Sequence, residues 1–366
     1  MPPASAPTVL VTGVAGNLGR RLVTQLSDFR IVGVDLYEAQ PDMQLPRFEI
    51  LDLGDEASCP QLVSLLRETN PAAVVHLAFV IDPVRSGVLE LDSMWRINVA
   101  GTARVMEAIA EFNRSGGAVR RFVYPSSVSA YGSDLPGMVT EDFPLGGHTL
   151  PYAIHKRETD EVVRQRAFWL GACSTWVLRP HIFAGSSVQN YLVGGFRGTP
   201  SGPGRLAAWM RNRGWRLPFP VPFGDEYLKT RFQFVHVDDV ARLIAWILRR
   251  PDAGPPVTVV NVAGRGEPLT LERCLAIGNN RMVRVPGRRG VRLALSLMWK
   301  LGISAVPPEA MPYITGSYLM DLTRLRDLLG ADFEKVIRYT VEEALVDTFR
   351  PAALPEAIEP AIAESA

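Results

Sequence analysis

Two side chains near the middle of the chain have the types and the spacing needed for acid–base chemistry on an alcohol or a ketone. Tyr152 and Lys156 are four residues apart, so they share one face if this segment is a helix. A free tyrosine has a pKa of about 10 and is a poor base at neutral pH. A neighbouring ammonium group favours the phenolate form, which indicates a tyrosine that exchanges a proton with a substrate oxygen.

A serine precedes this pair at the end of a predicted strand. Ser127 follows the apolar run 119–124, where its hydroxyl can hydrogen-bond a substrate oxygen while Tyr152 moves the proton. The Tyr-x-x-x-Lys spacing alone is common, and an isolated Tyr152 fits a helix surface better. Its place after a serine strand favours catalysis by Ser127, Tyr152 and Lys156, with a hydride passing between the substrate carbon and a nicotinamide.

A glycine-rich turn near the start of the chain predicts the cofactor. It follows a β-like run at 8–12 and opens a helical pattern at 17–27. In that context the first glycine permits a tight turn, the second lets the backbone approach phosphate oxygens, and the third allows close helix–strand packing. The helix start also favours an anion, whereas the alternative is an ordinary glycine turn. We expect a dinucleotide pyrophosphate at Gly13, Gly16, Asn17, Leu18 and Gly19.

Carboxylates at the ends of the next strands suggest how the ribose and adenine of the nucleotide are recognised. Asp35 can accept hydrogen bonds from both ribose hydroxyls and repel a 2′-phosphate, which favours NAD over NADP; the alternative is an aspartate that caps the next turn. Asp52 and Leu53 can hold the adenine amine and face, although Asp52 fits a helix N-cap equally well. Ala78 closes the fourth strand at the cofactor edge, near His76, which we expect to pack rather than to catalyse.

Composition limits the remaining functional classes. The chain has 366 residues, of which 47% are hydrophobic and 21% charged, as in a globular protein with a sizeable core. Its net charge of +1 gives no electrostatic argument for nucleic acid or an anionic membrane. Three cysteines without CxxC spacing indicate no disulfide framework, no metal site and a reducing, cytoplasmic setting. We see no signal peptide, and Val291–Val306 is too short and too charged to span a bilayer.

Short apolar runs alternate with longer helical patterns through the first half of the chain. This order predicts an α/β fold, a Rossmann-type doubly wound parallel sheet with right-handed crossovers and helices on both faces. Strands are expected at 8–12, 30–35, 48–51, 72–78, 119–124 and 174–178, and helices at 17–27, 56–68 and 88–112.

Domain boundaries follow from where this alternation stops. Residues 185–230 are rich in Gly, Pro and aromatic side chains, which predicts irregular, cleft-lining structure. A strand at 232–237, a helix at 240–249 and a last strand at 257–262 return to the pattern. We assign 1–180, with 231–264 returning to the sheet, to an NAD-binding core, 181–230 and 265–350 to a smaller C-terminal substrate-side domain, and 351–366 to a disordered tail.

Taken together, these motifs resemble the extended short-chain dehydrogenase/reductase family, in its NAD-dependent epimerase/dehydratase branch. The resemblance covers about residues 8 to 350. It implies that Ser127, Tyr152 and Lys156 are catalytic and that Asn98 stabilises the active-site helix. His236 and the pair Asp238–Asp239 are implied to be structural, with an aspartate as the N-cap of the next helix.

The resemblance also implies a homodimer. Members of the family often pack the helix at 88–112 and the Tyr152 helix into a four-helix bundle across a two-fold axis. Apolar residues of these helices can serve that contact or face the sheet instead; they are Ile97, Met106, Ile109 and Val162.

Departures from the family pattern concern the substrate. Enzymes of this branch that act on nucleotide sugars usually carry Asn where this chain has Ile182, and often Arg where it has Phe232. Arg231 is one residue away, so it points to the other strand face. Phe79 replaces a small residue near the nicotinamide edge. A less polar substrate becomes plausible, although the apolar segment 291–311 also fits simple packing on the core.

The leading interpretation is an NAD-dependent epimerase or oxidoreductase acting on a secondary alcohol or ketone, sugar nucleotides included. Dehydration is disfavoured, because Val128 and Ser129 follow Ser127 where dehydratases carry an Asp–Glu pair. The alternative is a net alcohol dehydrogenase or ketone reductase for an apolar, hydroxysteroid-type substrate. A non-catalytic NAD-binding regulatory module is a third alternative, disfavoured because Tyr152 and Lys156 are both present.

Overall fold

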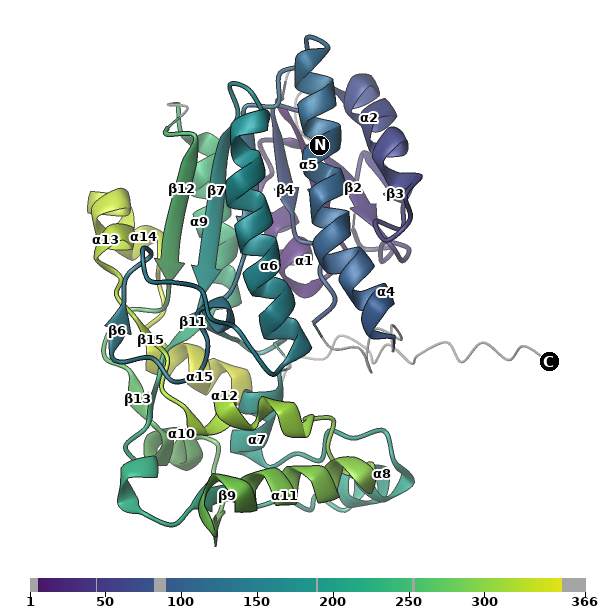
Figure 1. Ribbon diagram of the computed structural model, residues 1–366. Coiled ribbons are helices and arrows are strands. Elements are labelled where there is room, and N and C mark those ends of the chain that lie inside the picture. The colour runs from purple at the N-terminus through teal and green to yellow at the C-terminus, as the bar shows by residue number, and fades with distance from the viewer. Residues whose placement is uncertain (1–5, 44, 82–89, 189, 252–253, 351–366) are drawn as a thin grey trace, which may run out of the picture.

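A seven-stranded parallel sheet forms the centre of the computed structural model, which describes residues 6–43, 45–81, 90–188, 190–251 and 254–350 (Figure 1). Its strands are β1 (Thr8–Thr12), β2 (Arg30–Asp35), β3 (Arg47–Ile50), β4 (Ala73–His76), β5 (Arg121–Pro125), β7 (Ser174–Pro180) and β12 (Val257–Val262). They lie in the order β12–β7–β5–β4–β1–β2–β3, and every neighbouring pair is parallel.

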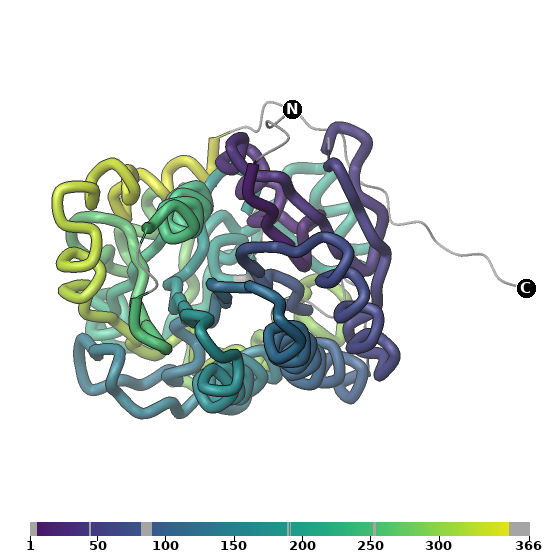
Figure 2. Tube along the Cα trace, turned by 90° about the horizontal axis from the view of Figure 1, so that it is seen from above, coloured from purple at the N-terminus to yellow at the C-terminus, as the bar shows by residue number. Residues whose placement is uncertain are grey.

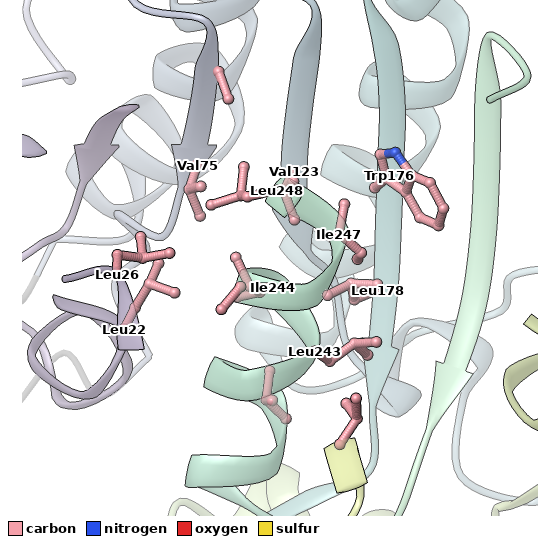
Figure 3. Packing of buried hydrophobic residues seen from close by; sticks show 14 of the residues in the cluster. Leu22, Leu26, Val75, Val123, Trp176, Leu178, Leu243, Ile244, Ile247 and Leu248 are labelled. Carbon is pink, nitrogen blue, oxygen red and sulfur yellow. The ribbon is translucent and has the colours of Figure 1, made fainter. Parts of the chain in front are cut away.

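Helices cover both faces of this sheet (Figures 1 and 2). One face carries α1 (Asn17–Gln25) and α9 (Val237–Arg249); the other carries α2 (Ser58–Thr69), α5 (Gly101–Arg114) and α6 (Pro151–Arg166). On the first face, Leu22 of α1, Leu26 at the end of that helix and Ile244 of α9 pack with Val75 and Val123 of the sheet (Figure 3). The predicted Rossmann-type doubly wound fold is confirmed.

The carboxyl edge of the sheet is where the predicted site residues meet. The chain adds β2 and β3 on one side of β1 and the later strands on the other, so the strand order reverses between β1 and β4. Ligands of such sheets bind outside the carboxyl ends of the strands at this point. Gly13 follows β1, Ala78 follows β4 and Ser127 follows β5, all at this edge.

The long helix predicted at 88–112 is divided in the structure. Residues 88 and 89 lie outside the described part of the chain; after them come α4 (Leu91–Trp95), a π-helical turn (Arg96–Ala100) and α5. The turn carries Asn98, which faces the interior and is fully buried. π-helical turns are frequent at functional sites, because the extra residue re-aims the side chains around it.

The strand predicted at 232–237 is present but interrupted, and it does not lie in the central sheet. The segment forms β10 (Arg231–Phe232) and β11 (Phe234–His236), which pair outside the central sheet with β13 (Leu269–Thr270) and β8 (Ile182–Ala184). Gln233 separates the two strands, because its side-chain amide pairs with both backbone groups of Met320. Only α9 and β12 therefore rejoin the Rossmann core.

Residues 185–230 were predicted to be irregular, but they contain three regular elements: α7 (Tyr191–Arg197), α8 (Arg205–Asn212) and β9 (Phe219–Pro222). Short helices form in this Gly-rich sequence because its polar and glycine residues serve as caps. Asn190 caps α7 by accepting a hydrogen bond from the Val193 amide, and Gly198 ends α7 in a left-handed conformation.

Of the remaining elements, the two helices of residues 323–336 pack on the Rossmann core beside β12 and α9, and the others gather beyond the carboxyl edge of the sheet (Figure 1). They surround a separate apolar core that includes Phe196, Phe219, Phe232 and Phe234. The predicted tail at 351–366 lies outside the described residues. The elements not yet named are β6 (Met138–Val139), α10 (Leu271–Ile277), β14 (Met282–Val285), α11 (Gly287–Lys300), α12 (Met311–Thr315), β15 (Leu319–Met320), α13 (Thr323–Leu329), α14 (Phe333–Val336) and α15 (Val341–Phe349).

In the described part of the chain, no helix combines the length and the apolar character that crossing a bilayer requires. The three cysteines, Cys59, Cys173 and Cys274, carry free thiols.

Candidate active site

The glycine turn after β1 has the geometry that a bound pyrophosphate requires. Gly13 has φ +70°, and a Cβ atom there would lie 2.4 Å from the backbone nitrogen of Ala78. A Cβ atom on Gly19 would lie 2.4 Å from the Val14 carbonyl oxygen, so α1 packs too closely for a side chain. Gly16 is exposed, and the first amides of α1 have no acceptor within the helix. The turn therefore fits a dinucleotide.

Asp35 shapes this turn from the end of β2. One carboxylate oxygen accepts a hydrogen bond from the Ala15 amide at 2.9 Å, and the other accepts one from the Leu36 amide at 2.8 Å. Burial raises the pKa of Asp35, and these amides oppose the shift. The residue thus caps the turn after β2, as the alternative prediction held, and also ties that turn to the glycine loop.

The other predicted nucleotide contacts occupy different environments. Asn17 binds Ser187 through its side chain at 2.9 Å, and Leu18 is partly buried against the core. Asp52 is exposed at the end of β3 and accepts a hydrogen bond from the Gly54 amide at 2.7 Å. It does not cap a helix, since α2 begins six residues later. Leu53 is buried in the core, which leaves Asp52 as the accessible member of that pair.

Tyr152 lies at the start of α6, at the mouth of the site. It is half-buried, and its ring meets the edge of Phe79 at a centroid distance of 5.8 Å. Burial raises the pKa of the Tyr152 phenol, and hydrogen bonds with Ser127 and Ser129 oppose that shift. The Ser129 hydroxyl also donates to the Ser127 hydroxyl at 2.9 Å. Ser129, which the sequence had suggested only as unable to assist dehydration, thus belongs to the hydroxyl cluster.

Lys156 is buried one helical turn further along α6. Its ammonium donates to the Pro125 carbonyl at 2.8 Å and to the Tyr124 hydroxyl at 3.4 Å. It also stands 3.6 Å from the centroid of the Phe79 ring. Burial lowers the pKa of Lys156 to about 7, and the nearby Asp160 opposes that shift. A buried lysine whose pKa lies near neutral pH is typical of a functional group.

Sequence reasoning missed Asp160, which continues the same stripe of α6. Its carboxylate takes two hydrogen bonds of 2.9 Å from the buried Arg179 guanidinium at the end of β7. Burial alone would raise the pKa of Asp160, but the Arg179 contacts outweigh it and hold the pKa below its usual range. The signal was present, since Asp160 stands four residues after Lys156.

Two buried polar residues, His76 and Asn98, connect the strands and helices that carry the site. The ring nitrogens of His76 contact the hydroxyls of Thr12 at 2.6 Å and Thr102 at 2.8 Å, and burial lowers its pKa to about 3. Asn98 pairs with both backbone groups of Val80, at 2.6 and 3.0 Å. His76 therefore joins β4 to β1 and α5, in agreement with its predicted packing role.

The residues that depart from the nucleotide-sugar pattern lie as the sequence predicted. Phe232 is completely buried in the second core, whereas Arg231 is exposed on the opposite face of β10. Ile182 is partly buried against the same core. None of these positions supplies a cation or an amide to the cleft.

His236 corrects one detail of the prediction. It is itself the N-cap of α9, where an aspartate was expected, because its Nδ1 accepts from the Asp238 amide at 3.2 Å. Asp239 instead accepts from the amides of Arg338 and Tyr339, at 3.0 and 3.1 Å. Asp238 pairs with Arg21 of α1, so all three residues join elements of the fold.

Comparison with known proteins agrees with this geometry. A model of the NAD-dependent epimerase/dehydratase family matches residues 9–263. The chain belongs to this family. Its members depend on NAD, and the fold and motifs are those of the extended short-chain dehydrogenase/reductase type.

Individual relatives of this family member are distant. A rice protein named UDP-glucose 4-epimerase 4 (Oryza sativa subsp. japonica) is 31% identical over 175 residues, which is 43% of this chain and 44% of that protein. The chain thus matches less than half the length of this curated relative. Solved structures share the fold: UDP-glucose 4-epimerase of Thermotoga maritima (20% identity, TM-score 0.63, 93% and 97% of the two chains) and of Thermus thermophilus (20%, 0.63, 94% and 99%).

The first prediction concerns Asp35. We expect Asp35→Ala to raise the affinity for NADP relative to NAD, because it removes the charge that repels a 2′-phosphate. Isothermal titration of both nucleotides measures the ratio of their Kd values. Asp42→Ala, on the exposed loop nearby, is the matched control. An unchanged ratio in Asp35→Ala contradicts the assignment.

The second prediction concerns Lys156. Because its pKa is lowered to about 7 in the folded protein, the unfolded chain binds one more proton between pH values of about 7 and 10. The unfolding free energy of NAD-free protein should therefore rise with pH in this window, by up to about 1.4 kcal/mol per pH unit. Urea unfolding should show that Lys156→Met loses this rise, whereas Lys229→Met at an exposed position keeps it. Parallel pH responses of all three proteins would refute the shift.

Proposed function

We propose that the protein is an NAD-dependent epimerase or oxidoreductase that acts on a secondary alcohol or a ketone through Ser127, Tyr152 and Lys156. The observation that carries this proposal is the convergence of the three residues beside the glycine turn. Ser127 follows β5, whereas Tyr152 and Lys156 come from α6, and Tyr152 hydrogen-bonds with Ser127.

Each residue has a separate task in this mechanism. Ser127 holds the substrate oxygen, and Tyr152 accepts its proton during oxidation and returns it during reduction. The Lys156 ammonium favours the phenolate form of Tyr152 through its charge. A bound NAD would supply the acceptor and donor for the hydride of the substrate carbon. Phe79 packs against both Tyr152 and Lys156, which limits the entry of water between them.

The nucleotide would be held by residues at the ends of four strands. Gly13, Gly16 and Gly19, with Asn17 and Leu18 at the start of α1, offer close backbone and free amides to the pyrophosphate. Asp35 supports recognition of the ribose hydroxyls and Asp52 that of the adenine amine. Leu53 and Ala78, which follow β3 and β4, would also line the nucleotide site.

Two observations favour different substrates. Relatives named as UDP-glucose 4-epimerases support an epimerase acting on a sugar nucleotide. Against this, Ile182 and the buried Phe232 replace polar diphosphate contacts, which supports net oxidation or reduction of a less polar, hydroxysteroid-type alcohol. Both substrate hypotheses use the same three proposed catalytic residues.

We also infer a homodimer built from α5 and α6, in a cytoplasmic protein. Ile97 and Val162 are partly exposed and available for such a contact. Met106 and Ile109 are buried against the sheet, so they belong to the subunit's own core instead.

Replacement of Tyr152 by phenylalanine tests the mechanism. We expect Tyr152→Phe to lower turnover on UDP-sugars or apolar secondary alcohols by about 100-fold to 10,000-fold, because the proton relay is lost. NAD affinity should remain within about twofold, since no charge changes. Tyr339→Phe, whose ring stacks on His236 and contacts none of the three proposed catalytic residues, should keep full activity. Near-normal turnover by Tyr152→Phe would falsify the assigned role.

Whether the purified protein retains NAD distinguishes the two substrate hypotheses. An epimerase recycles one NAD molecule, so we expect the purified protein to contain near-stoichiometric NAD that resists dialysis, quantified by chromatography after denaturation. Protein that is isolated empty and binds added NAD reversibly would instead support a net dehydrogenase and direct the substrate screen to apolar alcohols.

A further inference from the structure

Most of the exposed apolar side chains of the described chain lie in two segments of the substrate-side part. Of eighteen large hydrophobic residues that are exposed in the described chain, ten lie in the segments 206–223 and 282–301. These segments include α8, β9, β14 and α11. The ten are Leu206, Trp209, Trp215, Phe223, Met282, Val283, Leu293, Leu297, Trp299 and Leu301.

Helix α11 has apolar side chains on two opposite sides. Its inner residues, Leu295 and Met298, line a small apolar cavity of about 50 Å³ together with Phe219. On the outer side, Leu293 and Leu297 are 71% and 57% exposed, and Leu301 continues the row at the same spacing of four residues. Packing on the core therefore explains only the inner side chains of α11. The sequence had suggested that the whole apolar segment 291–311 could pack in this way.

Helix α8 extends the same surface. The Gly204 amide at its start donates to the Gly302 carbonyl just after α11, at 2.9 Å, and the Gly202 amide donates to the Ile303 carbonyl at 2.9 Å. The two helices lie at the end of the molecule beyond the carboxyl edge of the sheet (Figure 1). Trp209 of α8 meets Trp215 edge to face at 5.1 Å, and both rings remain exposed.

The charge on this surface is one-sided, although the whole chain carries only +1. The segments 204–224 and 281–308 contain ten basic residues and no acidic one. Two of the ten form ion pairs, Arg284 with Asp225 and Arg288 with Asp134. The other eight form no ion pair with any residue of the described chain; they are Arg205, Arg211, Arg213, Arg216, Arg281, Arg289, Arg292 and Lys300.

We propose that this α8–α11 surface docks on an anionic lipid bilayer. Interfacial helices bury a row of Leu and Trp side chains at the boundary between headgroups and acyl chains, and flanking Lys and Arg side chains bind the negative headgroups. The surface has both features. Flexible leucines in a row, rather than stacked aromatics alone, favour acyl chains over nucleic-acid bases as the occupant.

Vesicle flotation of the full-length protein tests this proposal without any measurement of activity. We expect the protein to float with vesicles that contain phosphatidylglycerol, to float poorly with pure phosphatidylcholine, and to be released by high salt. Leu293→Ser with Leu297→Ser, and separately Arg289→Glu with Arg292→Glu, should each weaken binding by about tenfold or more. Circular dichroism and NAD titration verify that these variants fold.

A matched control carries equally exposed apolar residues elsewhere. Phe168 and Trp169, 70% and 64% exposed at the end of α6, should be replaceable by serine with no change in flotation. The proposal is overturned by absence of binding to the anionic vesicles or by equal losses in this control. It is also overturned if light scattering shows a dimer that only the leucine variant dissociates, or if the surface binds an oligonucleotide more tightly than the vesicles.

Discussion

The buried ion pair between Asp160 and Arg179 is the constraint on which the active site depends. Asp160 stands on the same stripe of α6 as Tyr152 and Lys156, and Arg179 comes from β7, the strand next to the edge strand β12. Because both groups are shielded from water, losing either one would leave an uncompensated buried charge, at a cost of about 3–5 kcal/mol. The pair therefore fixes the rotation and depth of α6, and with them the position of the phenol and the ammonium.

The same arrangement accounts for the burial of Lys156. A buried ammonium is costly, and this one is compensated by the Pro125 carbonyl, the Phe79 ring and the field of Asp160. Its lowered pKa is the sign that the compensation is incomplete. The protein thus keeps a destabilising charge at the place where the chemistry of this family needs one, which is common at functional sites.

The substrate-side half of the molecule combines two unusual features. Ile182 and Phe232 stand where the resemblance to nucleotide-sugar enzymes implies diphosphate contacts, and the outer surface carries the apolar and basic residues of α8 and α11. A bilayer-docked enzyme would have direct access to substrates that partition into lipid. The two proposals therefore support one another, although each depends on different residues and different measurements.

The sequence alone predicted the Rossmann core, and it supplied the residues that we propose to be reactive. Glycine spacing, the apolar runs and the Tyr152–Lys156 interval are local patterns, and local patterns predict strands, turns and helix faces. Several strand limits, such as those of β1, β2 and β12, agree with the prediction because apolar runs and turn residues mark both ends. The short helices of 185–230 were missed because their caps matter more than their periodicity.

Only the tertiary structure decided which distant residues act together. The Asp160–Arg179 pair, the contact of Phe79 with Lys156 and the role of His236 as a helix cap each join segments or orientations that no local pattern encodes. The concentration of basic residues on α8 and α11 could not be recognised from the sequence for the same reason. A net charge sums over the whole chain, whereas a surface forms only when folding brings α8 and α11 together and leaves their outer sides without a partner.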